Sequence, residues 1–364
     1  MSRAALVFLL VACSKQPSSV SAPGANSGGS DASGGTSAAA SAGAAAANVG
    51  GTTGGTIGSA GEPDTFDASG CDHPVVSPDC NSGWCKIPAG CFVMGSPDSE
   101  WNHAPQERRA KTTLTRAFLI QETEVTQREW TSAGLANPSG TIEDPNGDFG
   151  QGECVADACP VGNVNWFEAA SYANLLSEKE GLEPCYVLKG CKGTIGVGYG
   201  GLYCDSFEIT TDTIYACKGY RLPTGAEWEY AARAGAKTAF YNGDITTRAE
   251  VGICVAEPAL DAIAWYCSNS GKLAHPVKEL QPNAWGLYDM LGNIFEWSHD
   301  QSGWTAESET LTDPDQTYGP GQGRDMRGGF RGLAPLQLRL ANRLGLSASF
   351  KSHGFGFRLA RAAP

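Results

Sequence analysis

Cysteine is the residue type that most constrains what this chain can fold into. The 364 residues include thirteen cysteines, and the first, Cys13, stands apart near the start of the chain. The other twelve are an even number, which in an exported protein implies disulfides. Metal binding is the alternative, but it needs two CxxC-type pairs, and the sequence contains none. We therefore expect a domain that is stapled by disulfides.

The spacing of the twelve cysteines favours short-range pairs. We expect Cys185 and Cys217 to close an insertion around a smaller loop. The local pairs that we expect are Cys154–Cys159, Cys191–Cys204 and Cys254–Cys267, and Cys71, Cys80, Cys85 and Cys91 are expected to pair among themselves. No cysteine follows Cys267, so the last 97 residues contain none.

The first residues resemble an export signal. The apolar run from Ala4 to Ala12 is far shorter than the roughly 18 to 20 residues that span a bilayer. It ends in Leu-Val-Ala-Cys13, which resembles the lipobox of bacterial lipoproteins, whose cysteine carries the lipid. We therefore expect a lipoprotein signal peptide over 1–12, lipidation of Cys13 and, because Ser14 follows, anchoring in the outer membrane. The alternative is an ordinary signal peptide with a coincidental cysteine.

The next segment has almost nothing to bury. From Ser14 to about Ser69 it consists nearly entirely of Ala, Gly, Ser, Thr and Pro, so burial cannot offset the entropy cost of ordering it. We expect a disordered, flexible tether over 13–70 and one domain over 71–364. The net charge of −13, with no basic run, argues against a nucleic-acid partner.

Local signals within the domain indicate few helices. Thr126, Asn165 and Thr224 are each followed three residues later by Glu, the pattern of a capping box at a helix start. Residues 91–94 and 116–120 resemble short strands. The charged residues Arg221, Glu227 and Glu229 are better explained by capping and ion pairing than by acid–base chemistry. The same structural interpretation applies to Arg327, Arg339, Arg343 and Arg358. The five histidines have no HxxxH or similar spacing, so an iron site is unsupported.

Several segments resemble, in order, the formylglycine-generating-enzyme (sulfatase-modifying-factor) family. They are Ile87–Ser96 (IPAGCFVMGS), Phe118–Trp130 (FLIQETEVTQREW), Tyr220–Arg233 (YRLPTGAEWEYAAR), Asn283–Trp297 (NAWGLYDMLGNIFEW), Arg327–Gly329 (RGG) and Gly356–Arg358 (GFR). The resemblance covers about residues 85–361. It implies an α+β fold that is irregular, loop-rich and C-type-lectin-like.

The Asn283–Trp297 segment carries a candidate calcium site. Asp289 and Glu296 flank a turn that contains glycine, where side-chain and carbonyl oxygens could converge, and Ca²⁺ takes six to eight such oxygens. The resemblance implies four ligands: Asp289, the Gly292 carbonyl, the Ile294 carbonyl and Glu296. The alternative is a turn in which Glu296 pairs with a buried arginine. A second calcium site of the family does not match residues 268–276 and is not carried over.

The same resemblance shows that this chain lacks the two cysteines that bind copper in the family's enzyme. The family's enzyme oxidises a substrate cysteine with oxygen and a Cu(I) ion held by two thiolates. They lie five residues apart, after an Arg-Gly-Gly-Ser turn. In this frame the serine position is Phe330 and the two cysteine positions are Leu333 and Leu338. Leucine has no lone pair for copper, so we expect neither bound copper nor a catalytic residue.

Two functions follow from these features. The first is a non-catalytic binding or structural module, lipid-anchored at the cell envelope and monomeric, whose ligand is a peptide, a glycan or another envelope protein. The alternative is an active formylglycine-type oxidase, or a related oxidase on this fold, working through a metal site that the sequence does not reveal.

Overall fold

The computed structural model describes residues 65–139, 154–197, 201–317 and 323–364. The expected signal peptide, Cys13 and most of the expected tether lie outside these residues. The last part of the expected tether, residues 65–70, already contacts the domain. Phe66 lies under the guanidinium of Arg109, and Asp67 pairs with Lys111 at 3.2 Å.

Helices are few and short, and three of them begin where the sequence predicts. Thr126, Asn165 and Thr224 each accept a hydrogen bond from the amide of the Glu three residues on, and that Glu accepts one from the cap's own amide. These capping boxes satisfy amides that lack a partner within the helix. The α-helices of the described residues are α2 (Gln127–Ser132), α3 (Trp166–Lys179), α4 (Gly225–Arg233) and α5 (Pro258–Asp261). The 3₁₀ helices are Pro105–Glu107, Ile214–Ala216 and Pro335–Gln337.

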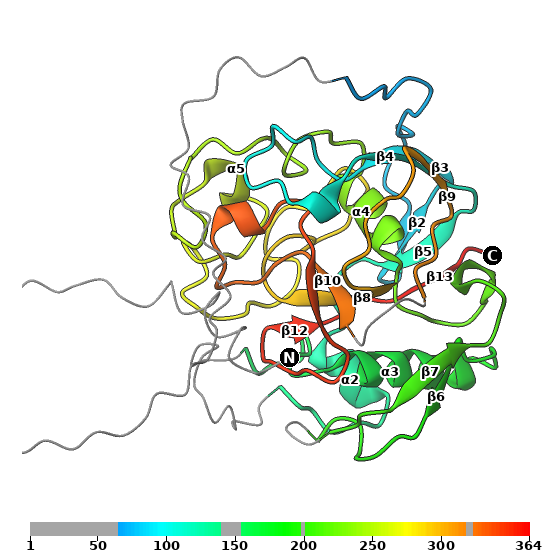
Figure 1. Ribbon diagram of the computed structural model, residues 1–364. Coiled ribbons are helices and arrows are strands. Elements are labelled where there is room, and N and C mark those ends of the chain that lie inside the picture. Colours follow the sequence, from blue (N-terminus) through cyan, green and yellow to red (C-terminus); the bar gives the residue numbers. More distant parts are fainter. Residues whose placement is uncertain (1–64, 140–153, 198–200, 318–322) are drawn as a thin grey trace, which may run out of the picture. The chain divides into compact units, whose positions relative to one another are not determined.

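Short strands make up four small sheets (Figure 1). The first contains, in spatial order, β1 (Cys80–Asn81), β2 (Trp84–Ile87), β5 (Phe118–Gln121) and β13 (Ala360–Ala362). The second contains β11 (Leu344–Ser347), β10 (Gly323–Arg327), β8 (Phe295–Gln301) and β12 (Phe355–Gly356). The third contains β3 (Gly90–Met94), β4 (Ala110–Leu114) and β9 (Thr310–Thr312), and the fourth β6 (Tyr186–Lys189) and β7 (Ser206–Ile209).

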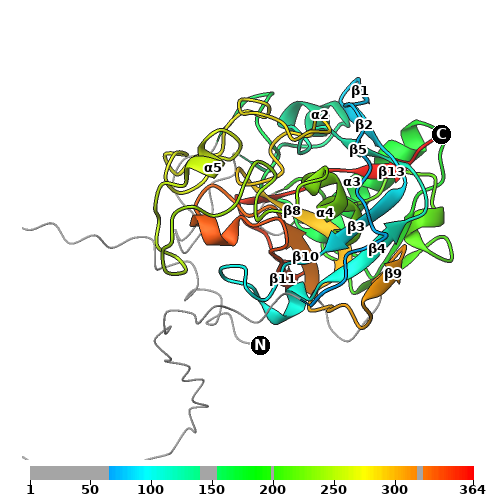
Figure 2. The ribbon, with the colours of Figure 1, turned by 90° about the horizontal axis from the view of Figure 1, so that it is seen from above.

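Two of these sheets join distant parts of the chain. β4 lies between β3, its antiparallel neighbour, and β9, which pairs with it in parallel (Figure 2). β8 likewise pairs antiparallel with β10 and parallel with β12. Long connections without regular structure separate most of the elements. The architecture is therefore the irregular, loop-rich α+β fold expected from the sequence.

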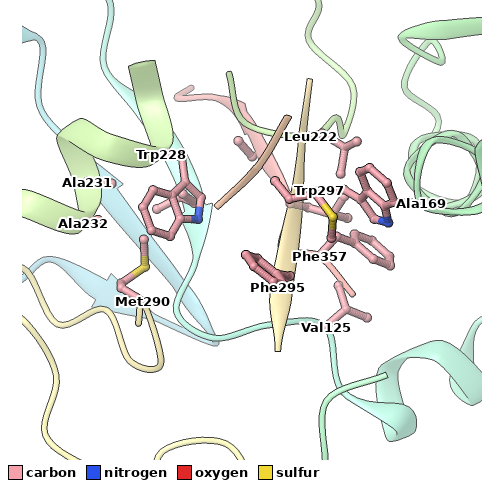
Figure 3. Packing of buried hydrophobic residues seen from close by; sticks show 14 of the residues in the cluster. Val125, Ala169, Leu222, Trp228, Ala231, Ala232, Met290, Phe295, Trp297 and Phe357 are labelled. Carbon is pink, nitrogen blue, oxygen red and sulfur yellow. The ribbon is translucent and has the colours of Figure 1, made fainter. Parts of the chain in front are cut away.

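The core is built around β8. All seven of its residues are buried, as expected for a strand that is covered on both faces. Trp228 of α4 and Met290 lie on one side of this strand, and Phe357 and Val125 lie on the other (Figure 3). α4 also contacts β3 and β10, so this helix ties two sheets together. No helix among the described residues is long and apolar enough to cross a bilayer.

Six disulfides join the twelve cysteines of the domain. The four specific pairs expected from spacing are present, and the N-terminal group pairs as Cys71–Cys91 and Cys80–Cys85. Cys80 and Cys85 face each other across the β1–β2 hairpin. A domain with this much irregular chain gains stability because the links restrict its unfolded state.

Candidate functional site

The positions that hold copper in the resembling enzymes are apolar here. Phe330 stacks on Phe295 with ring centroids 5.6 Å apart, and Leu338 is fully buried in the core. Leu333 is nearly as buried, and its carbonyl accepts a hydrogen bond from the Cys267 amide. Every cysteine of the described residues is in a disulfide. These residues therefore offer no thiolate for a soft metal ion.

The acids on α4 are structural. Glu227 closes the capping box and forms a bidentate ion pair with Arg221, with N–O distances of 2.6 and 2.7 Å. Glu229 is fully buried and accepts hydrogen bonds from Arg233, from the Gly95 amide and from Arg327. This confirms the capping and ion-pairing interpretation of these residues.

The candidate calcium turn lies at the start of β8. Asp289 and Asn293 both have positive φ, and Gly292 has φ +78°. A Cβ at Gly292 would collide with the Trp265 carbonyl, so this close approach requires glycine. The Gly292 amide donates to the Gly328 carbonyl and the Asn293 amide to the Trp265 carbonyl. Among the described residues, no main-chain amide donates to the carbonyl oxygens of Gly292 and Ile294.

The two carboxylates of the turn are both buried but differ in their partners. Glu296 forms a bidentate pair with Arg358 at 2.7 and 2.8 Å and also accepts a bond from the Trp228 indole. The structure therefore contains the ion pair that the sequence left as an alternative to calcium. Asp289 has no arginine partner, and its one hydrogen bond in the described residues comes from the Lys278 amide at 2.9 Å.

Sequence reasoning missed a third acid in this region. Glu124, in the Glu-Val-Thr segment, is fully buried, and its Oε1 accepts a hydrogen bond from the Asn293 amide group. Its Oε2 has no hydrogen-bond partner among the described residues. Burial, and then the charge of Asp289, raises the pKa of Glu124 well above its ordinary value. The sequence carries no signal of this, because acids are mostly exposed and Glu124 has no distinctive spacing.

The charges of this cluster do not balance. With all groups ionised, Glu124, Asp289 and Glu296 carry three negative charges against the one positive charge of Arg358. Burial raises the pKa of Asp289 to about 6, the charge of Glu296 adds to this, and Arg358 opposes it. Protonation of two carboxyls is one way to remove the excess charge of −2, and a divalent cation is another. A cation here would be held by carbonyl oxygens of the turn as well as by carboxylates.

Comparison with known proteins identifies the same family as the sequence motifs. The family model described as "Sulfatase-modifying factor enzyme 1-like domain" matches residues 74–363. The formylglycine-generating enzyme of Streptomyces coelicolor is 29% identical over 319 residues, which are 80% of this chain and 92% of that protein. The chaperone protein LppX of Paenibacillus barcinonensis is 31% identical over 220 residues, 55% of this chain and 66% of that protein.

A solved structure supports the same assignment. Treponema denticola variable protein 1 superposes with a TM-score of 0.60 at 30% identity, covering 76% of this chain and 94% of that one. The expected motifs, their order and the fold thus agree with both kinds of comparison. This chain belongs to the formylglycine-generating-enzyme (sulfatase-modifying-factor) family.

Proposed function

We propose that this chain is a non-catalytic binding module on the formylglycine-generating-enzyme fold. The observation that carries the proposal is the pair Leu333 and Leu338, buried where the family's enzymes hold copper between two thiolates. Without those ligands the chain cannot bind and activate oxygen by the family's chemistry. The relative named as a chaperone supports a role in binding other proteins or peptides. A glycan is the other ligand class that the proposal includes.

An active oxidase is the competing function. The reason is that the match between this chain and the formylglycine-generating enzyme of Streptomyces coelicolor covers 92% of that enzyme. The test incubates the full chain with copper, a reductant, oxygen and a cysteine-containing sulfatase peptide, with a family enzyme as the positive control. Mass spectrometry is expected to find no formylglycine and metal analysis no stoichiometric copper. Conversion of the peptide by the purified chain would overturn the proposal.

The proposal places the module at the cell envelope, anchored in the outer membrane by lipid on Cys13. The six disulfides fit an extracytoplasmic protein, and the lipobox-like start supports the anchor. Radiolabelled fatty acid is expected to label the wild type and not the Cys13→Ala variant. Label that survives the substitution would contradict the anchor.

Calcium is the cofactor that this proposal assigns, held by Asp289, Glu296 and the carbonyls of Gly292 and Ile294. The excess negative charge of the buried cluster supports it, and so do the two carbonyls, which no main-chain amide of the described residues contacts. The ion would bind and orient the turn before β8. It has no role in chemistry here, and nucleic acid, copper and a second subunit are not part of the proposal.

A further inference from the structure

One disulfide is less shielded from solvent than the other five. In each of the other five at least one cysteine is buried, and the buried members are Cys71, Cys85, Cys159, Cys185, Cys204 and Cys217. In the sixth pair neither cysteine is buried, because Cys254 is exposed and Cys267 is half-buried. A disulfide is opened when a thiolate reaches one of its sulfur atoms, so exposure decides where opening can begin.

Exposure of one cysteine is not sufficient, and the pair Cys191–Cys204 shows why. Cys191 is exposed, but its partner Cys204 is only 7% exposed. Attack on Cys191 would expel Cys204 as a thiolate, and burial disfavours that charged form. Beside this disulfide, Lys192 and Tyr203 also exchange two main-chain hydrogen bonds of 2.9 Å, which hold the two cysteines together.

The Cys254–Cys267 disulfide combines an exposed point of attack with a leaving group that is not buried. Attack at Cys254 releases Cys267, which packs against the edge of the core but is only half-buried. The Cys267 amide donates to the Leu333 carbonyl at 3.2 Å, so its backbone is held when the sulfur is released. A leaving thiolate in contact with water costs less than a buried one, and exchange is faster when the leaving thiolate is more stable.

Other contacts keep the loop between these two cysteines closed. The Glu257 amide donates to the Tyr266 hydroxyl at 2.7 Å, and this bond joins the two ends of the loop directly. The Glu257 carboxylate accepts hydrogen bonds from the amides of Thr246 and Thr247 at 2.9 and 2.7 Å. Leu260, within the loop, is fully buried. Opening the disulfide therefore leaves the loop in place, and its cysteines stay close enough to be oxidised again.

We infer that Cys254–Cys267 is a thiol–disulfide exchange site that reacts with an external dithiol or with two external thiols. The first thiolate bonds to the sulfur of Cys254, the bond between the two cysteines breaks, and Cys267 leaves as a thiolate that takes a proton from water. The second thiolate attacks the external sulfur of this mixed disulfide and releases Cys254, which is protonated in turn. Two electrons pass to the pair, and the external thiols become a disulfide. The inference goes beyond the proposed function, because it does not depend on what the module binds.

The test treats the folded full chain with dithiothreitol for increasing times, after N-ethylmaleimide has blocked any free thiol, Cys13 included. New thiols are labelled with iodoacetamide and located by mass spectrometry, while near-ultraviolet circular dichroism follows the fold. We expect Cys254 and Cys267 to be labelled about tenfold faster than any other cysteine, with an unchanged spectrum. Another pair that opens first or equally fast, or a native spectrum that is lost together with the first label, would overturn the inference.

Two double variants provide the matched comparison, because both pairs have a sequence separation of 13 residues. The variant with Cys254→Ala and Cys267→Ala should lose the fast phase of reduction and keep the slow ones. The variant with Cys191→Ala and Cys204→Ala should keep the fast phase. A fast phase that survives the first pair of substitutions would contradict the assignment. The time course of the wild type needs no variant, so it tests the inference even where a variant does not fold.

Two further reductants identify the source of the thiol. Reduced thioredoxin presents a protein dithiol and reduced glutathione a small single thiol, and they are compared at equal thiol concentration. A faster reaction with thioredoxin would assign a dithiol protein as the partner, and an equal or faster reaction with glutathione would assign a small thiol. No reaction with either would overturn the inference, because only a strong laboratory reductant would then open the pair. Peptide oxidation by the chain would count against the proposed function and leave a measured exchange site intact.

Discussion

Replacing Glu229 with glutamine is expected to lower the free energy of unfolding by about 3–5 kcal/mol. Glu229 is fully buried and holds three arginines: Arg233 at 2.8 Å, Arg327 at 3.1 Å and Arg343 at 3.9 Å. Burial alone would raise the pKa of its carboxyl, but the charges of the three arginines outweigh burial and lower it. Glutamine has nearly the same shape but removes the negative charge that these three arginines share. The loss would therefore come from charge, not from packing.

The measurement is equilibrium unfolding of the variant and the wild type in guanidinium chloride with the disulfides intact. A shift of the midpoint at unchanged m-value reports a change in stability. Asp157→Asn is the matched control, because Asp157 pairs with Arg128 at 3.1 Å while both side chains are about 70% exposed. Exposed pairs of this kind contribute roughly 0–1 kcal/mol. Equal losses in the two variants would show that the buried network does not stabilise the domain as we describe.

Calcium is expected to raise the free energy of unfolding by about 2.7 kcal/mol at a hundredfold excess over its dissociation constant. The physical reason is that the ion would neutralise the excess charge of Glu124, Asp289 and Glu296 in a site that exists only in the folded chain. A chelator should therefore lower the melting temperature of the full chain. Asp289→Asn should abolish the difference between the calcium and chelator curves.

The choice of variants separates ion binding from burial. Asp325 is as buried as Asp289, and burial likewise raises its pKa to about 6, but it does not belong to the turn. Asp325→Asn should keep the full response to calcium. Glu296 is a poor choice, because its loss would also strand Arg358 and destabilise the chain without calcium. Identical melting curves in calcium and chelator for the wild type would refute the site.

Features that depend on neighbours in sequence could be predicted. A capping box needs two side chains three residues apart, so Thr126, Asn165 and Thr224 were sufficient to place three helix starts. The disulfide Cys154–Cys159 was predictable for a similar reason, because a separation of five residues keeps two cysteines close in any compact chain. The loss of the copper ligands was also predictable, because the Arg-Gly-Gly turn aligns Leu333 and Leu338 with the family's two cysteines.

The partners that buried charges find in distant parts of the sequence were not predictable. Arg339 pairs with Glu107 and Arg358 with Glu296, across 232 and 62 residues of sequence. Glu124 joins the Asp289 turn through Asn293, which is 169 residues away in the sequence. The 39 residues after Asp325 contain five arginines beyond Arg327 and no Asp or Glu, so their need for distant acids is visible in the sequence. The sequence does not show which of these arginines has no acid partner among the described residues.

The sequence by itself determined the family, three helix starts and the loss of the copper cysteines, and it indicated four of the six cysteine pairs, because each depends mainly on residue identity and spacing. Only the tertiary structure decided that Glu296 already has an arginine, that Glu124 shares its cluster, and that buried Arg331 has no acid partner among the described residues. The physical reason is that the cost of a charge depends on every group that removes water from it. Those groups come from many segments, and folding alone brings them together.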